Sequence, residues 1–223
     1  MSAAALSPVS SAQPSKAHSK ALILTLGEEQ RAAIERHLLA LGERDRYLRF
    51  GYQASDEQIR RYVARLDFGR DELFGIFDRQ LELVAMAHLG YLFASGQQHL
   101  AEFGVSVSPS RRGRGHGQQL FERAVVHARN QGVSRLIVYA LSENAAMLRI
   151  ARKAGASVQR EGSESEAALQ LPPADFGSQL GELVAEQIAR TDYRVKSAVL
   201  QVSQVLDLVH EIREGVREAK RRS

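Results

Sequence analysis

The stretch SPSRRGRGHGQQLF at residues 108–121 constrains the fold of this chain more than any other segment. Three arginines and three glycines fill residues 111–117, directly after an alternating apolar run and directly before a helix-like run. Backbone N–H groups can converge on a phosphate only where side chains do not intrude, and helix N-termini attract anions. Arginines among the glycines add charge for anionic oxygens. The pattern therefore predicts a strand, a phosphate-binding loop and a helix, in that order.

Three other interpretations of this loop fit less well. A dinucleotide-binding loop has the spacing G-x-G-x-x-G, whereas the glycines here are spaced G-x-G-x-G. A P-loop ends in Gly-Lys followed by Ser or Thr, and that ending is missing. An arginine-glycine segment that binds nucleic acid would be repetitive and would carry aromatic residues for stacking, whereas this loop is single. We therefore expect the loop to hold the phosphates of another cofactor.

The residues before the loop alternate as in a strand with one buried face. The apolar face consists of Ala101, Phe103, Val105 and Val107. The opposite face is small and polar, and consists of Glu102, Gly104, Ser106 and Ser108. A sheet face of this kind leaves room for a ligand to lie close to the backbone, beside one carboxylate.

The rest of the pattern predicts a mixed α/β domain. A helix at 27–41 and a second helix, opened by the capping box Ser55–Gln58, come first. Apolar runs at 73–77, 82–92 and 98–108 then predict an antiparallel meander. After the loop we expect a helix at 117–130, a buried strand at 135–141, a helix capped by Asn144 and a hairpin at 156–171.

Composition excludes several classes of protein. The chain has no cysteine, so it forms no disulfide and has no thiolate metal ligand or cysteine nucleophile. Its net charge of +4 is only mildly basic, and we expect no nucleic-acid partner. No apolar run approaches the ~18 residues that span a bilayer, so we expect no membrane partner and a cytoplasmic location. The histidines show no paired metal spacing, and we expect no metal.

The chain divides into three segments by composition. Residues 1–19 are rich in Ser, Ala and Pro and are expected to be disordered, residues 20–175 form the main domain, and residues 176–223 form an amphipathic helix. In this helix, apolar residues recur every seven positions at Ile188, Val195, Val202, Val209 and Val216. The repeat predicts a coiled coil that joins two copies through residues 188–216. The alternative is one long helix docked on its own domain.

The loop and the helix after the buried strand resemble the GNAT superfamily of acyl-CoA-dependent N-acetyltransferases. Arg112–Gly117 matches the family's signature Arg/Gln-x-x-Gly-x-Gly/Ala, and the helix opened by Asn144 resembles its second cofactor region. Residues 45–50, DRYLRF, resemble the start of the GNAT domain in Pat-type protein-lysine acetyltransferases. The resemblance implies the GNAT fold, an α/β (α+β) domain with a mixed, mostly antiparallel sheet flanked by helices, here with a C-terminal long-helix extension.

The resemblance also implies an activity. The chain would transfer an acetyl group from the cosubstrate acetyl-CoA directly to a primary amine, either a protein lysine or a small molecule, in a ternary complex. The pyrophosphate would lie on the loop N–H groups and the pantetheine arm beside the preceding strand. The cofactor-binding residues implied are Val105, Ser106, Val107, Arg112, Gly113, Arg114, Gly115, His116, Gly117 and Asn144.

Glu102 is the expected catalytic base, because it lies ten residues before Arg112, where members that use a strand-four glutamate carry theirs. A base is needed because free lysine titrates at about pH 10.4 and its ammonium has no lone pair. The chain departs from the family at Ala151, where many members carry a tyrosine that protonates the departing thiolate. Tyr139 and Ser142 are alternatives, although strand packing and N-terminal capping are the roles that we expect for them. The departure leaves a second function open, a non-catalytic acyl-CoA-binding regulatory module assembled through its C-terminal helix.

Overall fold

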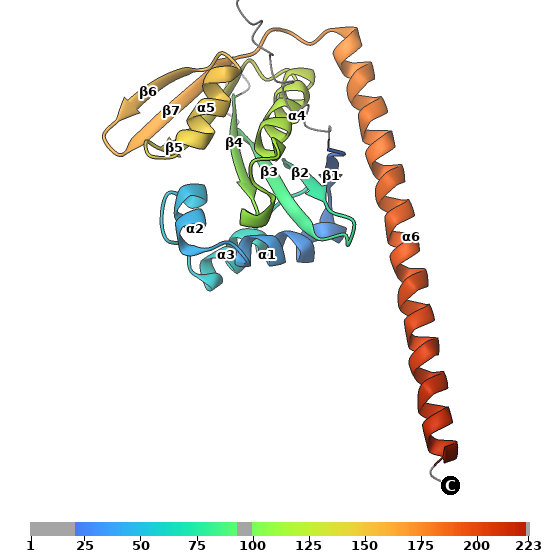
Figure 1. Ribbon diagram of the computed structural model, residues 1–223. Helices are drawn as coiled ribbons and strands as arrows, with labels where there is room; N and C mark the ends of the chain where they lie inside the picture. The colour runs from blue at the N-terminus through green and yellow to red at the C-terminus, as the bar shows by residue number, and fades with distance from the viewer. Residues whose placement is uncertain (1–20, 93–99, 222–223) are drawn as a thin grey trace, which may run out of the picture.

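A computed structural model of the chain describes residues 21–92 and 100–221, and the side chains up to residue 200 apart from that of Phe176. The segment 1–19, the connection between the predicted runs 82–92 and 98–108, and the side chains of the later heptads lie outside this description. The centre of the molecule is a seven-stranded sheet with the order β1-β2-β3-β4-β5-β7-β6 (Figure 1).

The strands are β1 (Leu24–Leu26), β2 (Asp71–Phe77), β3 (Leu83–Leu92), β4 (Leu100–Val107), β5 (Arg135–Leu141), β6 (Ser157–Glu161) and β7 (Glu164–Gln170). All neighbouring strands pair antiparallel except β4 and β5, which are parallel. The predicted mixed, mostly antiparallel sheet is therefore confirmed, as is the meander that became β2, β3 and β4.

The helices are α1 (Arg31–Leu39), α2 (Glu43–Phe50), α3 (Asp56–Ala64), α4 (His116–Asn130), α5 (Ala145–Lys153) and α6 (Phe176–Arg221), with 3-10 turns at Glu28–Gln30 and Pro109–Arg111. Both predicted caps form. The Ser55 hydroxyl accepts a hydrogen bond from the Gln58 amide at 3.3 Å, and the Asn144 side chain accepts one from the Met147 amide at 3.2 Å. Helix α2 was not predicted as a helix, because five of its eight residues, ERDRYLRF, are charged and the first four are consecutive.

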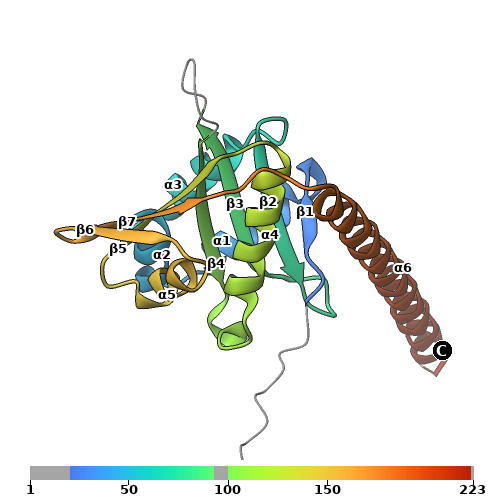
Figure 2. The ribbon, with the colours of Figure 1, turned by 90° about the horizontal axis from the view of Figure 1, so that it is seen from above.

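Helices cover both faces of the sheet. Figure 2 shows α4 on one face and α1, α2 and α3 on the other. Beneath α4, the rings of Phe103 and Phe121 meet edge to face with centroids 5.0 Å apart. On the opposite face, Ile34, Ile59 and Met86 are fully buried between the sheet and α1 and α3. Burial of apolar area on both faces stabilises the sheet at about 25 cal/mol per Å².

Helix α6 begins on the domain and continues past it (Figure 1). Its first turns contact α4 and β1. Ala189 is only 3% exposed there, and Glu182 accepts hydrogen bonds from Arg123, His127 and Asn130. The first part of the helix is thus docked on its own domain, the alternative to a helix that only dimerises. No helix in the described part of the chain combines the length and the apolar character that a membrane crossing needs.

Candidate active site

Strands β4 and β5 part at the centre of the sheet. They are in register at three pairs only, Leu100–Arg135, Ala101–Leu136 and Glu102–Ile137. Beyond these pairs a cleft of about 530 Å³ opens, lined by both strands, by the loop before α4 and by the start of α5. Within the described residues, no strand pairs with this edge of β4 after Glu102. The cleft therefore offers unpaired backbone groups to an extended ligand.

The glycines of the loop each have a structural reason. Gly113 and Gly115 have left-handed backbone conformations, with φ of 72° and 79°. Residues that carry a Cβ rarely adopt this conformation. At Gly117 a Cβ would lie 3.3 Å from Cδ1 of Ile150. Gly115 is the N-cap of α4 and provides no side-chain cap. The first turn of α4 therefore presents N–H groups without intrahelical acceptors, at the positive end of the helix dipole, where it lines the cleft.

Two of the three loop arginines are already paired. Arg111 Nη2 lies 2.6 Å from Oδ2 of Asp78, and Arg112 Nη2 lies 2.5 Å from Oδ1 of Asp45. Arg114 is exposed and forms no ion pair with any described residue. These two ion pairs fix the loop to the β2–β3 turn and to α2. The sequence pattern did not predict either pair. The Arg112 side chain nevertheless remains 51% exposed.

Ser106 lines the cleft with Val105 and Val107, but its hydroxyl is engaged elsewhere. Its Oγ lies 2.9 Å from Nε2 of His37, whose Nδ1 lies 2.9 Å from the Leu83 carbonyl oxygen. Burial lowers the pKa of His37 to about 4, so the ring is neutral. Because the carbonyl can only accept, Nδ1 donates to Leu83 and Nε2 accepts from Ser106. The side chain of Ser106 therefore faces α1, and its backbone faces the cleft.

Glu102 lies on the polar face of β4, opposite Gly90 of β3 and two residues before Gly104. Its carboxylate is exposed, and no hydrogen bond or ion pair joins it to the described residues. The negative charge of Glu102 acts on Tyr139. Burial and the carboxylates of Glu166 and Glu102 raise the pKa of this tyrosine. Glu102 is thus a solvated carboxylate near the point where the cleft begins.

The residues considered as proton donors differ in their environments. Ala151 is fully buried in the core under α5, so the position of the family's tyrosine carries no polar group. The Ser142 hydroxyl lies 2.9 Å from the Ser165 hydroxyl and donates a hydrogen bond to the Glu164 carbonyl at 2.9 Å. It therefore connects the end of β5 to the start of β7. Tyr139 lines the cleft and is 56% exposed.

The sequence pattern did not predict a polar cluster that lies on the face of the sheet covered by α2 and α3. Arg49 Nη2 donates to the Tyr62 hydroxyl at 3.2 Å, which lies 2.7 Å from Nδ1 of His88. The other nitrogen of His88 lies 3.6 Å from Asp71, while burial and the charge of Arg49 lower the pKa of the histidine. These residues come from four elements, and only the DRYLRF motif, which contains Arg49, could have pointed to them.

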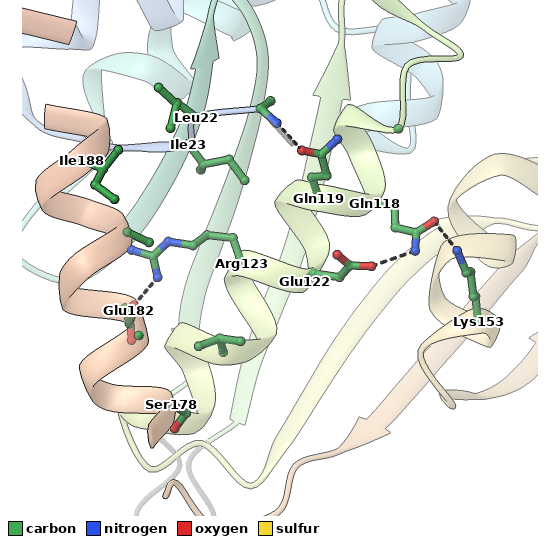
Figure 3. A pocket seen from close by; sticks show the side chains of 15 residues that line it. Leu22, Ile23, Gln118, Gln119, Glu122, Arg123, Lys153, Ser178, Glu182 and Ile188 are labelled. Carbon is green, nitrogen blue, oxygen red and sulfur yellow. Dashed lines mark hydrogen bonds and ion pairs between the residues drawn. The ribbon is translucent and has the colours of Figure 1, made fainter. Parts of the chain in front are cut away.

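A larger hollow of about 850 Å³ lies between α4 and α6 and shares Gly115 and Gln118 with the cleft (Figure 3). Its polar side chains already satisfy one another. Arg123 pairs with Glu182, and Gln118 donates to Glu122 at 2.7 Å and accepts from Lys153 at 3.0 Å. The β4–β5 cleft, with its open strand edge and helix N-terminus, is therefore the candidate site. Among the described residues no group of three His, Asp or Glu side chains could hold a metal ion.

Comparison with known families agrees with this geometry. The model of the acetyltransferase (GNAT) family matches residues 40–156, more than half of the chain. The chain therefore belongs to the GNAT acetyltransferase family, and its fold is the GNAT fold, as the resemblance implied. No curated protein matches the chain.

Solved structures share the fold at low sequence identity. The GNAT domain of S. lividans PAT is 19% identical, with a TM-score of 0.57 over 67% of this chain and 89% of that one. The Salmonella typhimurium protein yncA, solved with its cofactor acetyl-CoA, is 18% identical, with a TM-score of 0.54 over 70% and 97% of the two chains. Spermidine N-acetyltransferase from Vibrio cholerae, solved with CoA and spermine, is 15% identical, with a TM-score of 0.54 over 68% and 96%. These likenesses concern the fold alone.

Proposed function

We propose that this protein transfers an acetyl group from acetyl-CoA to a primary amine by direct attack within a ternary complex. The observation that carries the proposal is the parting of β4 and β5 beside a glycine loop that begins α4. An extended pantetheine arm fits an open strand edge, and a pyrophosphate fits converging backbone N–H groups. The cleft offers both, and two proteins of similar fold were solved with acetyl-CoA or CoA.

The cofactor would lie along the cleft from the loop to Glu102. The backbone of Val105, Ser106 and Val107 would pair with the pantetheine arm as an added strand. The N–H groups of residues 112–117 would hold the pyrophosphate, with Arg114, His116 and the exposed part of Arg112 beside them. Asn144 lines the same cleft, and its cap fixes the start of α5 there.

Glu102 would act as the base. Its carboxylate, directly or through one water, takes a proton from the acceptor ammonium, and the freed lone pair attacks the acetyl carbonyl carbon. The tetrahedral intermediate loses its extra N–H proton to water and collapses, and the C–S bond breaks with its electron pair on sulfur. A free thiol has a pKa of about 8.5, so the CoA thiolate can leave and be protonated by water without a tyrosine at position 151.

The acceptor is a protein lysine or a small-molecule amine. The proteins of similar fold include a PAT domain and a spermidine acetyltransferase, and they favour neither class. A screen of peptides and amines for CoA release would identify the acceptor. Binding of acetyl-CoA, measured by calorimetry, tests the cofactor independently: no binding at millimolar ligand would refute the proposal.

Ala151 favours one second candidate, a non-catalytic acyl-CoA-binding regulatory module assembled through α6. That module would bind acetyl-CoA in the same cleft but release no CoA with any acceptor. Its assembly would use the outer side of α6. The exposed large apolar residues of α6 up to residue 200 are between 52% and 64% exposed, and one of them, Ile188, borders the hollow between α4 and α6. They are Leu180, Leu183, Val184, Ile188, Val195 and Val199.

Both candidate functions include a homodimer that forms through residues 188–216. At 3.6 residues per turn, Val184, Ile188 and Val195 lie about 100° to 160° around the helix from the docked residues Glu182 and Ala189. The helix thus has one side on its own domain and an apolar stripe that faces away from that side. The stripe continues in the sequence as Val202, Val209 and Val216, which maintains the seven-residue apolar repeat of a coiled coil.

A further inference from the structure

The guanidinium of Arg49 lies against the backbone of β4 where the cleft begins. A Cβ added to Gly104 would lie 2.7 Å from Nη1, 2.8 Å from Cζ and 2.9 Å from Nη2 of Arg49. Contacts this short do not occur between real atoms of these types, so the group reaches this position because residue 104 has no side chain. Gly104 follows Glu102 on the same face of β4, just past the last pair with β5. Arg49 therefore lies where the reacting end of an arm paired with Val105–Val107 would arrive.

Arg49 differs from Arg111 and Arg112 because it has no counter-ion among the described residues. No carboxylate of the described residues lies within 4.0 Å of it, whereas Arg111 and Arg112 each pair with an aspartate. One Nη donates to Tyr62, and its buried Nε has no hydrogen-bond partner in the described part of the chain. A partly buried cation with unused donors is costly unless a ligand supplies negative charge.

The groups around Arg49 do not supply that charge. Burial lowers the pKa of both His37 and His88, and the charge of Arg49 lowers them further, so both rings are neutral. Burial raises the pKa of Tyr62, which is therefore also neutral. Asp71, the carboxylate of this cluster, lies 3.6 Å from His88 and forms no ion pair with Arg49. The aromatic rings that contact the guanidinium carry no net charge. A molecule in the cleft would supply the direct negative partner that Arg49 lacks.

We propose that Arg49 is a catalytic residue that stabilises the negative charge on the acetyl carbonyl oxygen during amine attack. When the N–C bond forms, the C=O π electrons move to oxygen, and the guanidinium donates a hydrogen bond to this oxyanion. On collapse the electrons return and the C–S bond breaks, with its pair on sulfur. Guanidinium stays charged at every working pH, so it needs no proton transfer for this role. The inference rests on the proposed acetyl transfer and adds a residue to it.

The substitution Gly104→Ala tests the position of the charge without removing it. The added methyl displaces the end of a flexible side chain, so the strand is expected to fold. We expect kcat to fall about 30-fold or more, towards the roughly 100-fold loss of a removed oxyanion donor, while the Kd for acetyl-CoA changes less than about threefold. Gly90→Ala is the matched control, because its methyl would meet only the His88 ring, at 3.9 Å and 4.0 Å. Its kcat should equal that of the unsubstituted protein.

The substitution Arg49→Gln tests the charge itself. We expect kcat to fall about 100-fold with little change in acceptor KM, partial recovery in Arg49→Lys, and rescue of Arg49→Ala by added methylguanidine. Tyr62→Phe removes the hydrogen-bond partner of Arg49 but keeps its charge, and should reduce kcat less than Arg49→Gln does.

Three results would overturn the inference while leaving acetyl transfer intact. An unchanged kcat in Arg49→Gln would show that the charge is not used. A rise confined to acceptor KM would assign Arg49 to an acceptor carboxylate, and a parallel rise in the Kd for acetyl-CoA would make it a cofactor anchor. Failure of the unsubstituted protein to bind acetyl-CoA would instead overturn the proposed function, and the role of Arg49 with it.

Discussion

His127 Nδ1 lies 2.5 Å from Oε1 of Glu182, and this ion pair fastens α6 to α4. The carboxylate also accepts hydrogen bonds from Arg123 and Asn130, and both paired side chains are only about a tenth exposed, 11% and 12%. Glu72 lies 3.5 Å from the other nitrogen of His127. The first part of α6 is therefore held by a buried polar network as well as by apolar contact.

Removing the charge of Glu182 should loosen this helix. The variant Glu182→Gln removes the carboxylate that Arg123 and His127 share, and removal of one partner of a buried ion pair costs about 3 kcal/mol. We expect the free energy of unfolding in urea to fall by about that amount and amide exchange in residues 182–193 to accelerate. Asp192→Asn is the control. Its partner Lys196 lies 2.5 Å away on α6 itself, and both are about one-third exposed, so the change should be under about 1 kcal/mol. Equal effects in both variants would contradict a docking role for Glu182.

The same pair should make stability depend on pH in a defined direction. Burial alone would lower the pKa of His127, but its hydrogen bond to Glu182 and the nearby carboxylate of Glu72 raise it from 6.5 to about 9. Burial opposes ionisation of Glu182, but hydrogen bonds from His127, Arg123 and Asn130 lower its pKa from 4.5 to about 2.

The stability contributed by His127 is therefore complete below about pH 6.5 and is lost as the pH rises through about 9. The contribution of Glu182 is complete above about pH 4.5 and is lost as the pH falls through about 2. Urea unfolding of the unsubstituted protein and of His127→Gln, measured from pH 5 to pH 10, checks this. The difference in stability between the two should shrink above about pH 8; a constant difference would refute the assignment.

Two glycines with the same backbone conformation should separate stability from cofactor binding. Gly113 in the loop and Gly132 after α4 have φ of 72° and 76°, and a Cβ at either would meet nothing within 4 Å. Alanine at each should cost about 1–2 kcal/mol of stability through backbone strain. Only Gly113→Ala should also raise the Kd for acetyl-CoA, by about tenfold, because it reorients the loop N–H groups. Equal affinities in calorimetry would remove the loop from the binding site.

Glu102→Gln should separate binding from catalysis. The amide preserves shape but cannot accept a proton at neutral pH, so we expect unchanged affinity for acetyl-CoA and a loss of kcat of about 100-fold or more. The defect should narrow as the pH approaches about 10, where an amine acceptor deprotonates without help. A turnover at pH 7 equal to that of the unsubstituted protein would exclude Glu102 as the base.

The outer stripe of α6 can be tested in the full chain. Val195 is 58% exposed, so Val195→Lys should leave the fold of the monomer unchanged. If α6 joins two copies, sedimentation should show a dimer for the unsubstituted protein and a monomer for this variant. Arg190→Gln alters an exposed residue off the stripe and should remain dimeric. A monomer for the unsubstituted protein at high micromolar concentration would refute the coiled-coil hypothesis.

The elements around the loop could be predicted because their signals are local. The alternation at 101–108, the glycines of the loop and the cap at Asn144 each act within a few residues, and the strands and helices they predicted are present within about two residues. Helix α2 carried no such signal, because five of its eight residues are charged and it packs against β4 and β5, which come later in the sequence.

The candidate site was predictable only in part, for the same reason. Glu102 and the loop lie close together in the sequence, whereas Arg49, Tyr62 and His88 meet because three separate elements cover one face of the sheet. Likewise, the heptad pattern describes the outer side of α6. Its docked side depends on Glu182, a charged residue that hydrophobic periodicity does not register.

Because β4 and β5 separate after three residue pairs, binding of the cosubstrate should also stabilise the folded protein. A ligand that binds the native state alone adds RT ln(1 + [L]/Kd) to the free energy of unfolding, about 2.7 kcal/mol at a concentration of 100 Kd. An arm that completes the sheet at Val105–Val107 would join its two halves where only three residue pairs now connect β4 and β5. The melting temperature of the protein would then report the acetyl-CoA concentration around it.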